Sequence, residues 1–282
     1  MTYLAAIFLG VIQGLTEFLP VSSSGHLVIA QWKMGYQPHD PNMILFDLMV
    51  HLGTVLAVLF YYRQSLVKYT MGLGRDIGGL SHPVKLYRNS PVYRVSFLAL
   101  AATFVTGLVY VLFDDIIESG FESPPMVAIC WLITATILLI TDRRGKVKGS
   151  LRDFGLIAAL MVGLAQGAAL FPGISRSGST ICIAVLFGLR RHWAGQFSFL
   201  IGVPAICGAT VIKFADYFSE GYPPPDWGPM IVGGLASAVV GLGALALLLW
   251  AVRRAKLKFF AIYCYLLAIV TFIVYTQAGG NG

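Results

Sequence analysis

The sequence predicts an all-α integral membrane protein: a polytopic helix bundle with inverted-topology repeats and two re-entrant or broken helix hairpins. Three observations predict this fold, namely the composition, the hydropathy pattern and a similarity between the two halves. Of the 282 residues, 57% are hydrophobic and 12% are charged, with a mean hydropathy of +0.77. Soluble domains carry about a quarter charged residues. We therefore expect lipid to surround much of this chain.

The apolar stretches define the expected spans. A transmembrane helix needs about 20 mostly apolar residues. Two more apolar stretches, 3–30 and 155–189, are each interrupted by Pro, Gly and Ser. No polar linker separates the stretches, so we expect one membrane domain over 1–282, with repeat 1 at about 1–113 and repeat 2 at about 154–277. The full-length candidates are 44–62, 92–113, 125–141, 195–213, 228–251 and 258–277.

The basic residues predict the topology. Seventeen of the 20 Lys and Arg residues lie in four short segments, with six in 63–94, five in 143–152, two in 190–191 and four in 253–258. The positive-inside rule places such loops in the cytoplasm. It also accounts for the net charge of +7, so we expect no nucleic-acid partner.

The same charges predict hairpins for the two interrupted stretches. Segment 155–189 begins and ends beside cytoplasmic loops, so it must enter the membrane and return. Because 44–62 runs inward to Arg63, segment 3–34 must begin and end on the outside. The two hairpins therefore enter the membrane from opposite sides.

An internal repeat joins these hairpins. At an offset of 153 residues, Gly-Val-Ile-Gln-Gly at 10–14 aligns with Gly-Leu-Ala-Gln-Gly at 163–167. Ser22 and Ser24 then align with Ser175 and Ser177. Similar broken helices of opposite entry are typical of inverted repeats, which build a polar site near the bilayer midplane. We therefore expect the two breaks to face each other.

The second break, Pro-Gly-Ile-Ser-Arg-Ser-Gly-Ser-Thr at 172–180, has the chemistry of an anion site. An ionisable residue within a span costs at least about 2.5 kcal/mol, which makes Arg176 a functional candidate. An Arg fork, Ser hydroxyls and the N–H groups of a helix N-terminus all bind phosphate. An ion pair of Arg176 with Glu17 that only joins the hairpins is the rival interpretation. The candidates for phosphate contact are Ser22, Ser24, Ser175, Ser177, Ser179 and Thr180.

The first break, 17–26, adds groups suited to hydrolysis. Glu17 offers a carboxylate for a metal ion or for proton transfer. Ser23 and His26 are three residues apart, which places them on one face of a helix as a nucleophile and its base. Attack by His26 itself, or by a water that it activates, remains an alternative in which Ser23 only holds a phosphate oxygen.

One further polar pair lies at the outer start of the span 44–62. Asp47 and His51 are four residues apart and are candidates for orienting the site. The ordinary polarity of a helix end explains them equally well.

Four motifs resemble one family, the bacterial undecaprenyl-diphosphate phosphatases, or bacitracin-resistance proteins. The resemblance implies removal of the terminal phosphate of undecaprenyl diphosphate at the outer face of the bacterial cytoplasmic membrane. The product would be the monophosphate that carries cell-wall precursors. The motifs are EFLPVSSSGH at 17–26 preceded by Gln13, PGISRSGST at 172–180, FDLMVHLGTVLAVL at 46–59, and FSFLIGVPAICGA at 197–209.

The same resemblance implies a cofactor and site residues. It implies a divalent cation, Mg²⁺ or Ca²⁺, with Glu17 and Gln13 as the metal candidates. Gln13 stands where many members have Glu, which leaves one fewer carboxylate. Glu17, Ser23, His26 and Arg176 match the family's functional positions. The expected partners are the polyprenyl diphosphate substrate and membrane lipid, and a homodimer is compatible with the sequence.

A secondary transporter or flippase for an anionic lipid or a small anion is the alternative function. Inverted repeats with broken helices are a common transporter architecture. A carrier needs binding groups but no nucleophile. The cluster of Glu17, Ser23 and His26 therefore favours the enzyme.

Overall fold

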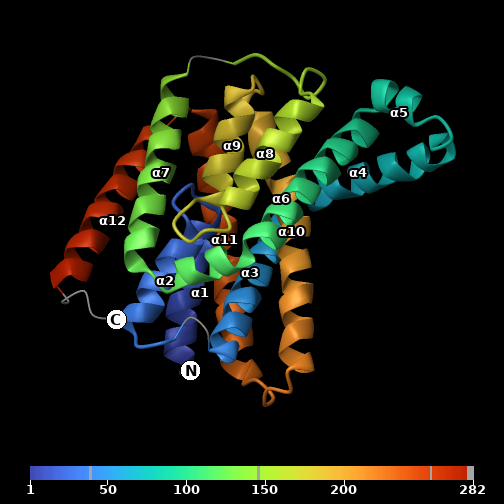
Figure 1. The fold of residues 1–282 in the computed structure, drawn as a ribbon. Helices are drawn as coiled ribbons and strands as arrows, with labels where there is room; N and C mark the ends of the chain where they lie inside the picture. The colour runs from blue at the N-terminus through green and yellow to red at the C-terminus, as the bar shows by residue number, and fades with distance from the viewer. Residues whose placement is uncertain (38–39, 145–146, 255, 278–282) are drawn as a thin grey trace.

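The computed structural model describes residues 1–37, 40–144, 147–254 and 256–277. Within these ranges the chain forms α-helices, one short 3-10 helix and a single isolated bridge between Gly149 and Leu189. The predicted all-α fold is confirmed (Figure 1). The last five residues of the predicted domain lie outside the described ranges.

Among the described residues, six helices are long and apolar enough to cross a membrane, and each matches one predicted stretch. Three of them begin with Pro at the first turn, where a proline's missing N–H costs nothing. The side chains of Asp40, Ser90 and Ser123 cap these three by accepting a backbone N–H. The six are α3 (Pro41–Tyr61), α6 (Pro91–Phe121), α7 (Pro124–Arg143), α10 (Arg191–Ser219), α11 (Trp227–Arg253) and α12 (Lys258–Gln277).

Two hairpins of shorter helices enter the bundle from opposite ends. The first is α1 (Tyr3–Phe18) with α2 (Ser23–Lys33), and the second is α8 (Leu156–Ala168) with α9 (Arg176–Leu186). At 1.5 Å per residue an 11-residue helix such as α2 or α9 reaches about 16 Å, roughly half a bilayer core. Figure 1 shows their turns meeting in the middle of the bundle.

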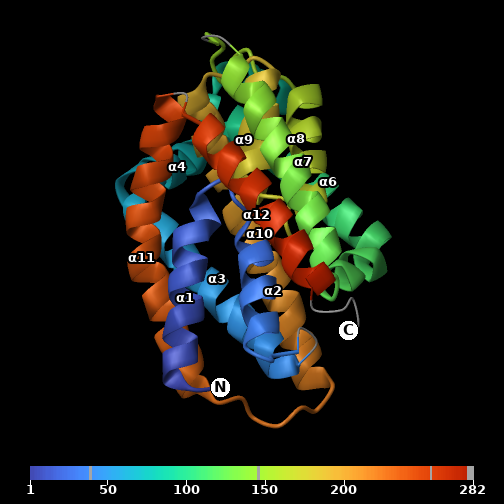
Figure 2. The same ribbon diagram turned by 90° about the vertical axis from the view of Figure 1, so that its left-hand side faces the viewer.

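The predicted basic segments gather at one end of the bundle. The C-terminal ends of α7, α9 and α11 lie at the end of the bundle opposite the start of α1 (Figures 1 and 2). From the end of α3, α4 (Arg63–Asp76), the 3-10 turn η1 (Ile77–Gly79) and α5 (Pro83–Asn89) extend sideways toward the level of that end. This arrangement agrees with the prediction that the basic segments lie on one side of the membrane.

Each hairpin packs its first helix against a long helix through glycine. Gly10 of α1 lies against the backbone carbonyl of Gly233 in α11, and Gly163 of α8 lies against that of Ala102 in α6. No Cβ fits at Gly10 or Gly163. Small residues at such crossings let helix backbones approach closely, which drives helix packing in lipid.

This packing predicts opposite effects for two Gly→Ala changes. Gly243→Ala, in α11 with open space around it, should raise stability through helix propensity by up to about 1 kcal/mol. Gly10→Ala should lower it by about 1–3 kcal/mol, because α1 and α11 must separate. Thermal unfolding in detergent measures the stability of both variants. Equal shifts of their unfolding temperatures would contradict the close packing of α1 on α11.

Candidate active site

Two side chains join the two hairpin turns by hydrogen bonds, and a third attaches the first turn to α7. The indole N–H of Trp131 in α7 donates to the Val21 carbonyl at 2.8 Å. Ser22 Oγ accepts from the Gly173 N–H at 3.0 Å, and Ser177 Oγ donates to the Leu19 carbonyl at 3.3 Å. Turn backbone groups inside a bilayer need such internal partners. These bonds hold the two turns against each other.

Ser22 has an unusual backbone. Its φ of 66° lies in the left-handed region, which non-glycine residues seldom occupy. From there its hydroxyl caps α2 by accepting the Gly25 N–H. Gly173 in the opposing turn has a φ of 100° and lies against the Val127 carbonyl, so a side chain there would be both strained and obstructed.

Glu17 is the centre of the polar groups at this junction. Ser23 Oγ donates to its Oε2 at 2.6 Å, and Gln13 Nε2 donates to the same atom at 2.9 Å. Its Oε1 forms an ion pair with Arg176 from the other hairpin. His51 Nε2 lies 3.6 Å from Oε2. The carboxylate is buried, so this network holds it in one orientation.

The expected pairing of Ser23 with His26 is wrong. His26 Nδ1 donates to the Ser22 carbonyl at 2.6 Å, and Nε2 lies 2.9 Å from the Tyr263 hydroxyl of α12. Its ring also stacks on that of Tyr263. The two ring nitrogens are therefore engaged away from Ser23, whose hydroxyl points to Glu17 instead.

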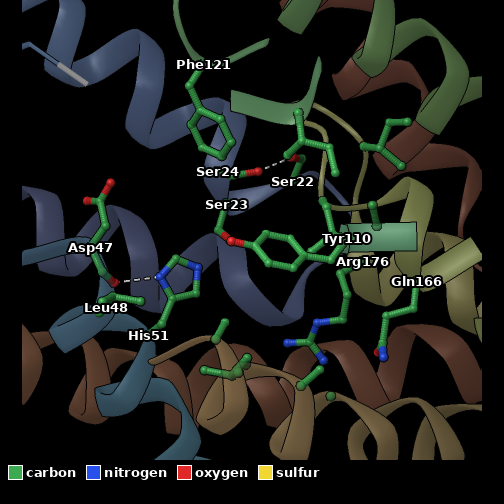
Figure 3. A pocket seen from close by; sticks show the side chains of 18 of the residues that line it. Ser22, Ser23, Ser24, Asp47, Leu48, His51, Tyr110, Phe121, Gln166 and Arg176 are labelled. Carbon is green, nitrogen blue, oxygen red and sulfur yellow. Dashed lines mark hydrogen bonds between the residues drawn. The ribbon is translucent and has the colours of Figure 1, made fainter. Parts of the chain in front are cut away.

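A cavity of about 330 Å³ opens beside Ser23 and Arg176 (Figure 3). Its walls come from α1, α2, α3, α6, α8, α10 and the start of α9 with the turn before it. Much of the wall is apolar, including Leu27, Leu48, Ile117, Leu170 and Ile206. The sequence-predicted residues that line it are Glu17, Ser22, Ser23, Ser24, Ser175 and Arg176.

Three predicted phosphate contacts do not line this cavity. Thr180 Oγ1 lies 2.6 Å from Ser198 Oγ of α10, and Ser177 donates to the Leu19 carbonyl. Ser179 is buried within α9. Because a helix turns each successive side chain to a new direction, only the start of α9 faces the cavity.

Several polar residues in the cavity wall were outside the predicted site. His51 and Asp47 were considered only as orienting residues, and Figure 3 shows His51 turned into the same space as Ser23 and Arg176. Gln166 also lines it, and its alignment with Gln13 in the repeat was the available signal. Tyr110 and Lys213 had no sequence signal of this kind.

The oxygen atoms near Glu17 are the groups that could hold the expected divalent cation. In the described residues no group of three or more His, Cys, Asp or Glu side chains could hold a metal ion. Gln13 Oε1, however, is buried without a hydrogen-bond partner beside the Glu17 carboxylate. Mg²⁺ and Ca²⁺ prefer oxygen ligands, and Mg²⁺ commonly takes few protein ligands together with phosphate oxygens. The two side chains fit such a partial ligand set.

Comparison with known proteins agrees with the motifs. The chain is 38% identical over 265 residues to an undecaprenyl-diphosphatase of Rubrobacter xylanophilus, covering 94% of this chain and 95% of the relative. It is also 38% identical over 278 residues to an undecaprenyl-diphosphatase of Desulfatibacillum aliphaticivorans, covering 97% and 99%. The family model described as Bacitracin resistance protein BacA matches residues 6–270. The chain therefore belongs to the BacA family of bacitracin-resistance proteins.

Proposed function

We propose that this protein hydrolyses undecaprenyl diphosphate to undecaprenyl phosphate and inorganic phosphate, which recycles the lipid carrier of cell-wall synthesis. One observation carries the proposal: Ser23 donates a 2.6 Å hydrogen bond to a buried carboxylate that is ion-paired with Arg176, at the edge of a cavity. The names of the relatives support the same substrate.

The cavity suits an amphiphile. Its polar end carries Ser23, Arg176 and His51, which match a diphosphate anion. The remaining wall is largely apolar, which matches a polyprenyl chain. A small inorganic anion would leave that apolar wall unfilled, so the alternative of a small-anion carrier is not favoured.

In the proposed reaction Ser23 Oγ attacks the terminal phosphorus, and Glu17 accepts its proton. The bond between that phosphorus and the bridging oxygen breaks, and undecaprenyl phosphate leaves. After Glu17 has passed this proton to the departing undecaprenyl phosphate, a water attacks the phosphoserine. Glu17 accepts the water's proton and returns it to Ser23 Oγ, which releases phosphate and restores Ser23. His26 has no part in these steps, because both its ring nitrogens are engaged elsewhere.

Arg176 has two roles in this scheme. In the structure its guanidinium pairs with Glu17. A bound phosphate competes for the guanidinium through two parallel N–H bonds. That change of partner frees Glu17 to take the serine proton, so the base is released only when substrate is present.

We propose that a divalent cation, Mg²⁺ or Ca²⁺, joins the site. Gln13 and Glu17 would hold it together with substrate oxygens. When bound, it would neutralise part of the diphosphate charge.

The location and assembly are also proposals. We place the protein in the bacterial cytoplasmic membrane as a multi-pass protein, with its cavity open to the outer face. The cavity wall includes Ile44, near the start of α3, and Lys213, near the end of α10, on the side of the two termini. Two repeats at about 1–113 and 154–277, and a homodimer, remain compatible with this arrangement.

Phosphate release tests the function. Purified protein in detergent should release one phosphate from each undecaprenyl diphosphate, and a chelator should abolish release until Mg²⁺ or Ca²⁺ is restored. Vesicles that transport the lipid without any phosphate release would support the transporter instead.

The serine mechanism predicts a large loss of turnover on Ser23→Ala. Removing the nucleophile removes the covalent step, so kcat should fall by several orders of magnitude, about 10³-fold or more. His26→Asn, which retains an N–H donor for the Ser22 carbonyl, should keep far more activity. Rapid quenching of wild-type protein with radiolabelled substrate should trap an acid-stable serine phosphate.

Two results would overturn this mechanism. An active Ser23→Ala enzyme would exclude serine as the nucleophile. An acid-labile, base-stable phosphate adduct would point to a histidine, and His51 is the one histidine among the described residues that lies in the cavity wall.

Arg176→Lys should lose most activity while the protein still inserts and folds. A lysine keeps the positive charge but cannot make two parallel bonds to phosphate. We expect kcat/KM to fall by about 100-fold or more, consistent with the roughly 2.7–4 kcal/mol typical of lost charge-stabilising donors. Steady-state kinetics measure this, and near-normal turnover would reduce Arg176 to a simple countercharge.

A further inference from the structure

The arm formed by residues 63–89 lies outside the site and outside the bundle. It joins the cavity-lining helices α3 and α6 and contains α4, η1 and α5. None of the residues in these three helices is buried. Figure 1 shows the arm extending sideways from the bundle, toward the level of the end that carries the basic segments.

The arm is nevertheless held in a defined position. The Tyr69 hydroxyl bonds with Ser96 Oγ of α6, and Ser90 Oγ donates to Asp76 at 2.6 Å. Gly72 lies close to Val92, where a Cβ would meet the valine side chain at 2.9 Å. One face of α4 is thus attached to α6, and the other faces remain open.

Those open faces carry large apolar side chains. Val67 and Met71 are one turn apart on α4 and are each 57% exposed. Ile77, Leu80 and Val84 continue the exposed apolar surface through η1 and α5. Exposed apolar surface of this extent marks a contact with lipid or with another protein.

Uncompensated positive charge accompanies this apolar surface. Lys68, Arg75, Lys85 and Arg88 form no ion pair within the described part of the chain. Asp76 is the one acidic residue in 63–94, and Ser90 already bonds to it. Lys68 and Arg75, two turns apart, lie beside the line of Val67 and Met71 on the helix surface. The open side of α4 therefore has an apolar strip and a basic strip.

The position of the arm identifies the partner. Helices α3 and α6 are candidate spans, and the arm joins the end of α3 to the start of α6, so it leaves the bundle at the level of a bilayer surface. Amphipathic helices with Lys and Arg beside an apolar face lie at this level. We propose that the arm binds the headgroups of anionic phospholipids, with Val67 and Met71 inserted at the boundary between headgroups and acyl chains.

A depth measurement tests the orientation. In full-length protein carrying Cys207→Ala, which removes the one native thiol that is not buried, an environment-sensitive dye is placed at Met71→Cys or at Lys68→Cys. In nanodiscs containing phosphatidylglycerol, nitroxides on the acyl chains should quench the Met71 dye several-fold more than the Lys68 dye. Equal quenching of the two dyes would overturn the proposal. Shielding of the Met71 dye that appears only when a nanodisc holds two copies of the protein would also overturn it.

A lipid-selectivity measurement tests the charges. The variant Lys68→Gln, Arg75→Gln, Lys85→Gln and Arg88→Gln should lose several-fold of the enrichment of phosphatidylglycerol over phosphatidylcholine among bound lipids, measured by native mass spectrometry. The matched control removes four cations from other basic segments at the same end, at Lys148, Arg152, Arg254 and Lys256. Equal losses in the two variants, or no loss in the arm variant, would overturn a specific role for the arm.

Discussion

The ion pair between the buried Glu17 and the partly buried Arg176 is the interaction on which the rest of this structure depends. Each charge lies in a helix too short to cross a bilayer, and an unpaired charge at such depth is strongly unfavourable. The two side chains come from hairpins that enter at opposite ends of the bundle. Their pairing therefore requires both hairpins to reach the same depth and to face each other.

A second constraint acts on the backbone of the turns. Each hairpin interrupts its helical hydrogen bonds inside the bundle, where water does not replace them. Ser22 and Ser175 cap the following helices, and Trp131 and Thr134 of α7 bond to the turn backbone. The serines beside the cavity thus serve the fold as well as the proposed chemistry. A substitution at Ser22 or Ser175 affects both.

The two halves share a fold but contribute different chemistry. The first hairpin brings the carboxylate and the proposed nucleophile, and the second brings the arginine. Gln13 bonds to Glu17, whereas its repeat counterpart Gln166 bonds to Thr106. Neither half alone contains a proton acceptor together with a phosphate clamp. The site therefore exists only where the halves meet, which explains how similar hairpins can build one asymmetric active site.

The sequence by itself determined the spans, the two hairpins and the two charged residues of the site. Apolar length and the interruptions by Pro, Gly and Ser act locally, so they can be read without a structure. An ionisable residue in an apolar stretch is likewise conspicuous, which is why Glu17 and Arg176 were found. The basic loops also predicted which helix ends lie together.

Only the tertiary structure decided the direction of individual side chains. Helical spacing placed Ser23 and His26 on one face of a helix. The left-handed backbone of Ser22 and the contact with Tyr263, which is 237 residues from His26, direct the imidazole away from the cavity. Tertiary contacts also direct Ser177 to the Leu19 carbonyl of the opposite hairpin and Thr180 to Ser198 of α10. His51 reaches Glu17 only because α3 packs beside the first hairpin. Such contacts join residues far apart in the chain, and local spacing carries no information about them.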